Sequence, residues 1–235
     1  MAVIHRTTMS PGKLELLAAW MPSKPWYRGG EAPLLAKAGG FRLDDPAGEV
    51  GIEFMVVTDT SGDSPVTYQV PMTYRGAPLE SAADGLIGTS EHGVLGRRWI
   101  YDGTHDVVLV EQLLALLAGR ATAQDQNASD APDPTVEVLT GAGGAAGAAG
   151  VPQGLTGPGH GPGAVAETAD ASLVTVGPAA QDGPVPTLTL TLCRVLRPGL
   201  APEGDGAAGR VLAGWSAPDG TRQHGSFAHL AAFER

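Results

Sequence analysis

Apolar and polar residues alternate along two neighbouring stretches of the first half of the chain. Residues 49–59 alternate, with Val50, Ile52, Phe54 and Val56 on one face, and residues 66–74 alternate again after a turn-forming segment, Ser61–Pro65. This pattern predicts two half-buried strands joined as an antiparallel hairpin. Because Pro71 has no N–H to donate, we expect it at a bulge or on a sheet edge. A third strand is expected over residues 93–101.

Two segments around these strands have helical patterns. Ser10 and Pro11 are suited to begin a helix that runs to Trp20, and the following prolines end it. Residues 107–118 are almost entirely apolar; Thr104 or Asp106 is expected to cap them, and Gly119 to close them. The order of helix, three strands and helix predicts an α+β domain over 1–120, with a curved antiparallel sheet packed on helices.

The second half of the chain changes in composition. Residues 121–186 are rich in Gly, Ala and Pro and acidic, and no Lys or Arg occurs between Ala121 and Cys193. We expect a disordered linker there, although two short tracts, 135–139 and 173–176, remain open as strands. Residues 187–235 alternate again over 187–196, 209–215 and 221–227, with a tight turn at Asp219 and Gly220. This β-rich segment is expected to dock on the first domain and extend its sheet.

Charge and composition exclude several classes of protein. The net charge is −10, and no basic footprint for nucleic acid is visible. No apolar run approaches the ~18 residues of a membrane span, and the N-terminus lacks the apolar stretch of a signal peptide. Cys193 is the single cysteine, expected as a small buried side chain, so an intrachain disulfide is impossible and a cytoplasmic location is expected.

Five ionisable residues flank the third expected strand: Glu91, His92, Asp102, His105 and Asp106. A strand of that length separates its ends by roughly 20–25 Å, so the two ends are not expected to bind one metal. A turn at one end and a helix cap at the other explain them structurally. Nucleophile-elbow, phosphate-loop and metal-binding spacings are absent from the sequence, and His224-Gly225 lacks the Asp of a kinase catalytic phrase. We therefore expect no catalytic residue, metal or cofactor; a hydrolase-like enzyme centred on His92 and His105 is the least favoured alternative.

Four phrases carry a family resemblance. They are Pro25-Trp26-Tyr27-Arg28-Gly29, Tyr68-Gln69-Val70-Pro71, Ile87-Gly88 and Tyr101-Asp102-Gly103-Thr104-His105-Asp106. Together they resemble the N-terminal cap of actinobacterial maltokinases and related sugar kinases, although Val107 stands where that family has proline. The resemblance covers about residues 1–120. It implies a cystatin-like domain that covers a nucleotide-binding lobe and supplies no catalytic group; a kinase body is not expected in this chain.

The resemblance implies an accessory role in α-glucan metabolism. The leading hypothesis is a non-catalytic cap-like protein that binds or regulates a partner enzyme of maltose, trehalose or glycogen metabolism, such as a sugar kinase, or that self-associates. The alternative is a module that binds a sugar or sugar phosphate through aromatic rings and arginine. The residues expected at the ligand or partner surface are Trp26, Tyr27, Arg28, Tyr74, Arg98, Trp99, Tyr101 and His105.

Overall fold

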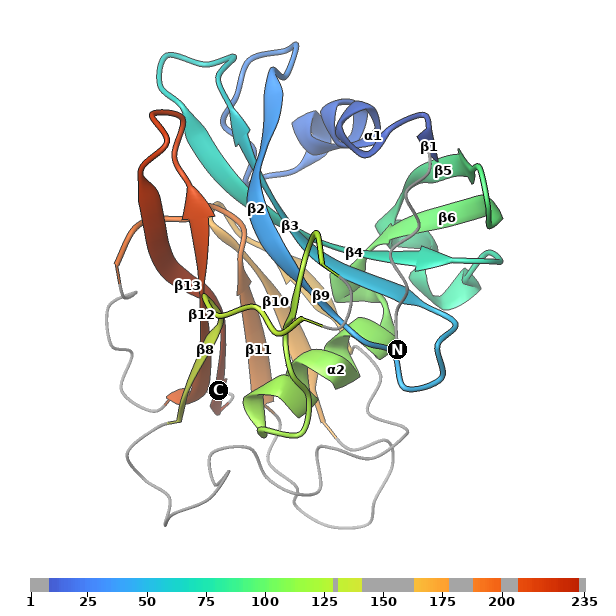
Figure 1. The fold of residues 1–235 in the computed structure, drawn as a ribbon, viewed down its shortest axis with the longest axis vertical. Coiled ribbons are helices and arrows are strands. Elements are labelled where there is room, and N and C mark those ends of the chain that lie inside the picture. The colour runs from blue at the N-terminus through green and yellow to red at the C-terminus, as the bar shows by residue number, and fades with distance from the viewer. Residues whose placement is uncertain (1–8, 129–130, 141–162, 178–187, 200–206, 233–235) are drawn as a thin grey trace.

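Antiparallel strands dominate the structure, a computed structural model that describes residues 9–128, 131–140, 163–177, 188–199 and 207–232 (Figure 1). The elements of the first half are β1 (Met9–Ser10), α1 (Lys13–Trp20), β2 (Leu35–Leu43), β3 (Gly51–Asp59), β4 (Val66–Arg75), β5 (Leu86–His92), β6 (Gly96–Asp102) and α2 (Val107–Leu117), with short 3-10 turns at Met21–Ser23, Glu80–Gly85 and Gly103–His105. The later elements are β7 (Gln124–Asp125), β8 (Glu137–Thr140), β9 (Val165–Glu167), β10 (Ala171–Val176), β11 (Leu188–Cys193), β12 (Ala207–Ser216) and β13 (Arg222–Ala232).

All these strands belong to one sheet of 13 strands. The order is β1-β5-β6-β4-β3-β2-β12-β13-β11-β10-β9, with β7 beside β2 and β8 beside β12. The expected antiparallel sheet is therefore present, but it is larger, and helices form a smaller share of the fold, than the α+β prediction implied. The C-terminal strands join this sheet beside β2, as expected, where Trp215 pairs with Gly39.

The predicted hairpin is confirmed as β3 and β4, which pair without interruption from Gly51–Tyr74 to Asp59–Val66. Pro71 pairs with Phe54 in regular register, so the prediction of a bulge or an edge strand is wrong. On the opposite side of β4, pairing with β6 covers only residues 72–75. Pro71 lies just beyond that pairing, in a position where its missing N–H costs no strand hydrogen bond.

Two strands were not predicted correctly from the pattern. The expected third strand over 93–101 corresponds to β6, and the strand before it, β5, was missed. The two strands pair around a tight turn between His92 and Gly96. Strand β2 was missed because its sequence, with two adjacent glycines and Lys37, lacks a clear alternation. Its register against β3 shifts between Lys37 and Gly39.

Both predicted helices are present. In α1 the residue before the first turn is Gly12 rather than Ser10, and the Gly12 N–H donates to Glu15 Oε2. In α2 the carboxylate of Asp106 accepts from Val108 N–H, which confirms one of the two expected caps. Gly119 follows α2 with φ of 69°, a left-handed conformation that suits glycine.

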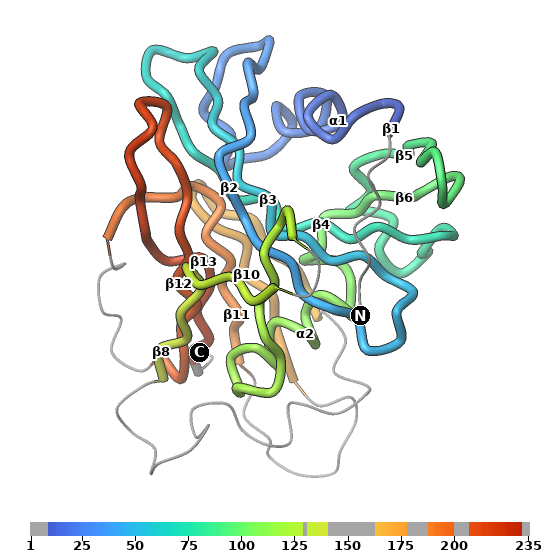
Figure 2. Tube along the Cα trace, viewed as in Figure 1, coloured from blue at the N-terminus to red at the C-terminus, as the bar shows by residue number. Residues whose placement is uncertain are grey.

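The sheet bends until the end of β11 returns to β4. Tyr68 pairs with Val195, Gln69 N–H donates to the Arg194 carbonyl, and Leu196 N–H donates to the Thr67 carbonyl. The trace in Figure 2 shows this course of the chain, with the C-terminal strands beside the strands of the first half. Segments far apart in sequence thus share backbone hydrogen bonds.

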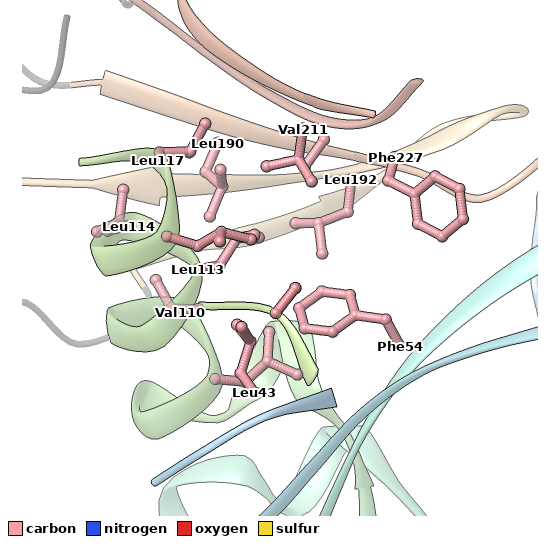
Figure 3. Packing of buried hydrophobic residues seen from close by; sticks show 14 of the residues in the cluster. Leu43, Phe54, Val110, Leu113, Leu114, Leu117, Leu190, Leu192, Val211 and Phe227 are labelled. Atoms are coloured by element: carbon pink, nitrogen blue, oxygen red, sulfur yellow. The ribbon is translucent and has the colours of Figure 1, made fainter. Parts of the chain in front are cut away.

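Two hydrophobic cores lie on opposite faces of β3. The larger joins apolar residues of β2, β3, α2 and β10–β13, including Phe54, Leu113 and Phe227 (Figure 3). The smaller packs α1 and the segment after it, including Trp26, against Met55 and Tyr68. Because β10–β13 supply much of the larger core, one face of the first-half sheet is covered by the second half of the chain.

Part of the expected disordered linker is ordered. Strands β7, β8, β9 and β10 all lie within 121–186, and Val174 and Val176 are fully buried. The two tracts left open as strands, 135–139 and 173–176, overlap β8 and β10, whereas the prediction of disorder is wrong for β7 and β9. Strand β10 pairs along its whole length with β11, a partner that the local composition does not reveal. The remainder, 141–162 and 178–186, lies outside the described residues.

Among the described residues, none of the helices has the length and apolar character needed to cross a membrane. Cys193 is partly buried and packs beside the larger core. Burial raises the pKa of its thiol, which fits the expected role as a small apolar side chain.

Candidate functional site

The side chains singled out from the sequence fall into two groups. Trp26, Arg28 and His105 lie near Arg194 or its neighbour Asp170. Tyr27 stacks on Tyr68, which also contacts the Trp26 ring. The other group, Tyr74, Arg98, Trp99 and Tyr101, lies along β4 and β6. The eight residues therefore do not form a single surface, and a ligand or partner role for them stays a prediction.

The first group surrounds a buried arginine. Arg194 follows β11 and is fully buried, with its guanidinium 5.2 Å from the centre of the Trp26 ring. Its Nη2 donates to Asp102 Oδ2 at 2.5 Å, and its Nε donates to Ser172 Oγ at 2.5 Å. Ser172 Oγ in turn donates to Glu167 Oε2. The network joins the end of β6 to β9, β10 and β11.

Asp102 is placed by the turn that follows β6. Its Oδ1 accepts from the backbone N–H and the hydroxyl of Thr104, which fixes the 3-10 turn over 103–105. Burial alone raises the pKa of this carboxyl. The Arg194 charge and the hydrogen bonds from Arg194 and Thr104 outweigh burial and hold the pKa below its ordinary value.

A metal is a poor fit to this cluster. One ligand atom from each of Asp102, His105 and Glu167 lies within 4.8 Å of the others. Both oxygens of Asp102 already accept hydrogen bonds, however, and Arg194 brings a permanent positive charge to within 3.7 Å of Glu167 Oε1. The guanidinium thus supplies the cation that these carboxylates need, so the arrangement is a buried ion-pair network.

Three buried polar atoms in this region have no hydrogen-bond partner within the described residues. They are Arg194 Nη1, Trp26 Nε1 and Glu167 Oε1. Buried groups of this kind are ordinarily satisfied by ordered water. Two of them are donors and one is an acceptor, which a water molecule can match.

Tyr27 and Arg28 are also held by protein groups. The Tyr27 hydroxyl donates to Asp59 Oδ2 at 2.6 Å, and burial together with the Asp59 carboxylate raises the pKa of Tyr27 to about 12. Arg28 pairs with Asp170 at 2.5 Å, and Asp170 also pairs with Arg197. This second ion-pair group lies beside Arg194 and again joins the first half of the chain to the second.

Tyr74 belongs to a separate cluster around Glu53. The Glu53 carboxylate is buried and accepts from Lys13 Nζ, the Tyr74 hydroxyl and Gln126 Nε2, all within 2.6 Å. Burial raises the pKa of Glu53, but the Lys13 charge and the hydrogen bonds outweigh it, so the net shift is downward. Burial and the Glu53 charge raise the pKa of Tyr74 well above its ordinary value. Tyr74 is thus committed to holding a buried carboxylate.

The remaining side chains of the second group differ in exposure. Tyr101 is buried, and its hydroxyl accepts from Leu79 N–H. Arg98 Nη2 donates to the Leu95 carbonyl, within the β5–β6 hairpin. Trp99 is half-buried, and the Arg97 guanidinium lies over its ring at 5.9 Å. Glu91 and His92 lie at the turn of this hairpin, at the opposite end of β6 from Asp102, as the strand length predicted.

Comparison with known families places the first half of the chain. Residues 20–106 match the family model of the maltokinase N-terminal cap domain. This part of the chain is similar to the maltokinase N-terminal cap domain and is hereafter the cap-like domain. The match confirms the resemblance and contains all eight candidate residues of the sequence analysis. It runs from the end of α1 through β6 to Asp106. No curated protein matches the chain.

Several residues that organise the cap-like domain were not anticipated from the sequence. Arg194, Glu53 and Asp59 each lie within or at the end of an apolar strand. A charged residue inside such a run is a usable signal, because burial of a charge requires a partner. Glu167 gave no such signal, since its surroundings in sequence are small and polar.

Proposed function

We propose that the protein is a non-catalytic accessory protein that binds or regulates a partner enzyme of maltose, trehalose or glycogen metabolism. The observation that carries this proposal is the match of residues 20–106 to the maltokinase N-terminal cap domain. A cap is a non-catalytic part of a larger assembly in the family that the chain resembles, so a partner enzyme is the natural counterpart.

The chemistry of the buried ionisable groups supports a non-catalytic role. Asp102 pairs with Arg194, Glu53 with Lys13, and Asp106 forms two hydrogen bonds with Arg75. Each of these carboxylates lies between protein donors, and for Asp102 and Glu53 these donors hold the pKa below its ordinary value. A general acid or base instead needs an open side and a pKa near the working pH.

A sugar-binding module receives less support from the geometry. Trp26 is fully buried, and the hydroxyls of Tyr27 and Tyr74 are held by Asp59 and Glu53. A stacking platform for a sugar requires accessible rings. Thermal-shift measurements with maltose, trehalose and their phosphates test this alternative, because a ligand of the native state raises the melting temperature.

Affinity capture tests the main proposal. The immobilised full chain is incubated with a lysate of the source organism, and retained proteins are identified by mass spectrometry against a bare-matrix control. We expect a sugar kinase or a glucan-metabolising enzyme, whose activity is then measured with and without the chain. Retention of no enzyme of sugar metabolism would overturn the proposal.

A further inference from the structure

The turn of the β5–β6 hairpin carries two adjacent exposed aliphatic residues. Val94 is 62% exposed and Leu95 is 45% exposed. Tight turns favour Gly, Asn, Asp and Ser, so two aliphatic residues at this place contradict ordinary turn chemistry. Figure 1 shows the hairpin at the edge of the molecule, away from the C-terminal strands. The large exposed apolar residues elsewhere in the described chain, Leu34, Leu86 and Leu139, have no such neighbour in sequence.

The hairpin turn is held in a fixed shape. The Nδ1 atom of His92 accepts from the N–H groups of Val94 and Leu95, at 3.3 and 3.0 Å. Arg98 Nη2 donates to the Leu95 carbonyl at 2.8 Å. A turn that is already ordered loses little conformational entropy when it docks on another protein. The two aliphatic side chains are therefore presented on a preorganised support.

The face of the hairpin that points away from α1 adds a basic and aromatic component. Its inner face is committed to the fold, since Ile100 lies in the smaller core and Ser90 donates to the Pro11 carbonyl. On the outer face, Arg97 is 60% exposed on its side chain and stacks over Trp99. Its carboxylate partner, Glu91, lies at 3.4 Å and is itself 66% exposed. Exposed pairs of this kind contribute little and exchange readily for another carboxylate.

We propose that Val94, Leu95, Arg97 and Trp99, hereafter the hairpin surface, bind an apolar pocket with an acidic rim on the partner enzyme. This inference rests on the proposed function and names the surface that it uses. Aliphatic side chains fill the pocket, while Arg97 exchanges Glu91 for a carboxylate of the rim. Trp and Arg are the residue types most enriched among energetically dominant interface contacts. Charge complementarity selects an acidic partner surface, since two arginines, Arg97 and Arg98, stand against one acid, Glu91, around the apolar pair, on a chain of net charge −10.

The faces of the first-half sheet that are already covered leave the hairpin surface accessible to a partner. One face of the first-half sheet is buried by β10–β13 and α2, and the other is largely covered by α1. The hairpin surface lies outside both covers. A partner enzyme can therefore reach it without displacing any described element.

Two pairs of variants test the hairpin surface. The double variant V94N/L95N is compared with L34N/L139N, whose side chains have matching exposures of 62% and 41%. R97E is compared with R222E, an exposed arginine of β13, so that both variants change the net charge equally. The sugar kinase or glucan enzyme captured by the wild-type chain is purified and titrated against each variant, after thermal melts confirm that all are folded.

We expect V94N/L95N to weaken binding at least about tenfold and R97E to weaken it about fivefold, with a smaller salt dependence for R97E. The two control variants should bind as the wild type does. Equal binding by V94N/L95N and wild type would overturn the hairpin surface while leaving the proposed function intact. Capture of no such enzyme by the wild type overturns the proposed function itself. A concentration-dependent dimer that V94N/L95N abolishes would assign the surface to a second copy of the chain and overturn the inference.

Discussion

Nη2 of Arg194 lies 2.5 Å from Oδ2 of Asp102, with both side chains fully buried and the two residues 92 positions apart in the sequence. The pair ties the end of the cap-like domain to the segment after β11. Removal of one member of a buried ion pair leaves an uncompensated charge in a medium of low polarity. The pair is therefore a sensitive point of the fold.

Substitution of this arginine gives the largest predicted loss of stability. We expect Arg194→Met to lower the free energy of unfolding by about 3–5 kcal/mol, measured by urea denaturation. Arg197→Gln is the control, since Arg197 is 65% exposed and its ion pair contributes about 0–1 kcal/mol. The double variant R194M/D102N should lose less than the sum of its single variants, because no buried charge is then stranded. Equal effects of R194M and R197Q would contradict the buried-pair interpretation.

The stability of the fold should decrease in acid. Asp102 and Glu53 both have pKa values below the ordinary ones, so each binds protons less readily in the folded than in the unfolded state. Their contributions are present above about pH 4, near the unfolded pKa values, and are lost as the pH falls through the folded ones. Urea titrations from pH 7 downward measure this loss. In Glu53→Gln the acid limb should be shallower than in the wild type, and an unchanged limb would count against the assignment.

Titration of Tyr27 tests its contact with Asp59. Ultraviolet difference absorbance should show one tyrosine ionising at about pH 12, the pKa that burial and Asp59 give Tyr27. Because the neutral phenol is the form that donates to the carboxylate, Asp59→Asn removes a negative neighbour and should lower that pKa. Asp63→Asn, an exposed acid in the same loop, is the matched control. Identical titration curves for the two variants would show that Asp59 does not control the phenol.

Gln69 offers a test of the return of β11 to β4. Its buried side-chain amide donates to the carbonyls of Cys193 and Phe227, both at 3.2 Å. Gln69→Leu keeps the approximate size but leaves both carbonyls unpaired, so we expect a loss of about 1–3 kcal/mol in the free energy of unfolding. Gln223→Leu, in which only an exposed bond to Thr221 is lost, should change stability by less than about 0.5 kcal/mol. Comparable losses in the two variants would argue against the described contact between β4 and the end of β11.

Much of the cap-like domain could be predicted from the local pattern of apolar and polar residues. The alternation over 49–59 and 66–74 identified β3 and β4, and the apolar run after Asp106 identified α2 with its cap. These elements can be recognised in the sequence because each buries apolar residues that recur with the period of a strand or a helix. The family phrases around Trp26 and Tyr101 were sufficient to indicate the cap, which the family match then confirmed.

The missed features depend on partners that are distant in sequence. Strand β10 is short and was left open within an apparent linker, and only its pairing with β11 makes it part of the sheet. The same holds for Arg194, whose burial is explained by Asp102 and Ser172 on other elements. Periodicity within one segment contains no information about which remote carboxylate will neutralise a buried guanidinium. The candidate site could therefore be predicted only in part, through Trp26, Arg28, Asp102 and His105.

The bend of the sheet affects folding during synthesis, because it joins strands of the first half of the chain to strands that are made last. Gln69 finds its carbonyl partners 124 and 158 residues further along the chain. Contacts of such high sequence separation form late and slowly, because the loop must close before any of them is gained. The apolar side of β2 and β3 can thus be covered only by α2 on the ribosome until β10–β13 have emerged. We expect the nascent first half to depend on chaperones, and the completed chain to acquire its stability in a single late step.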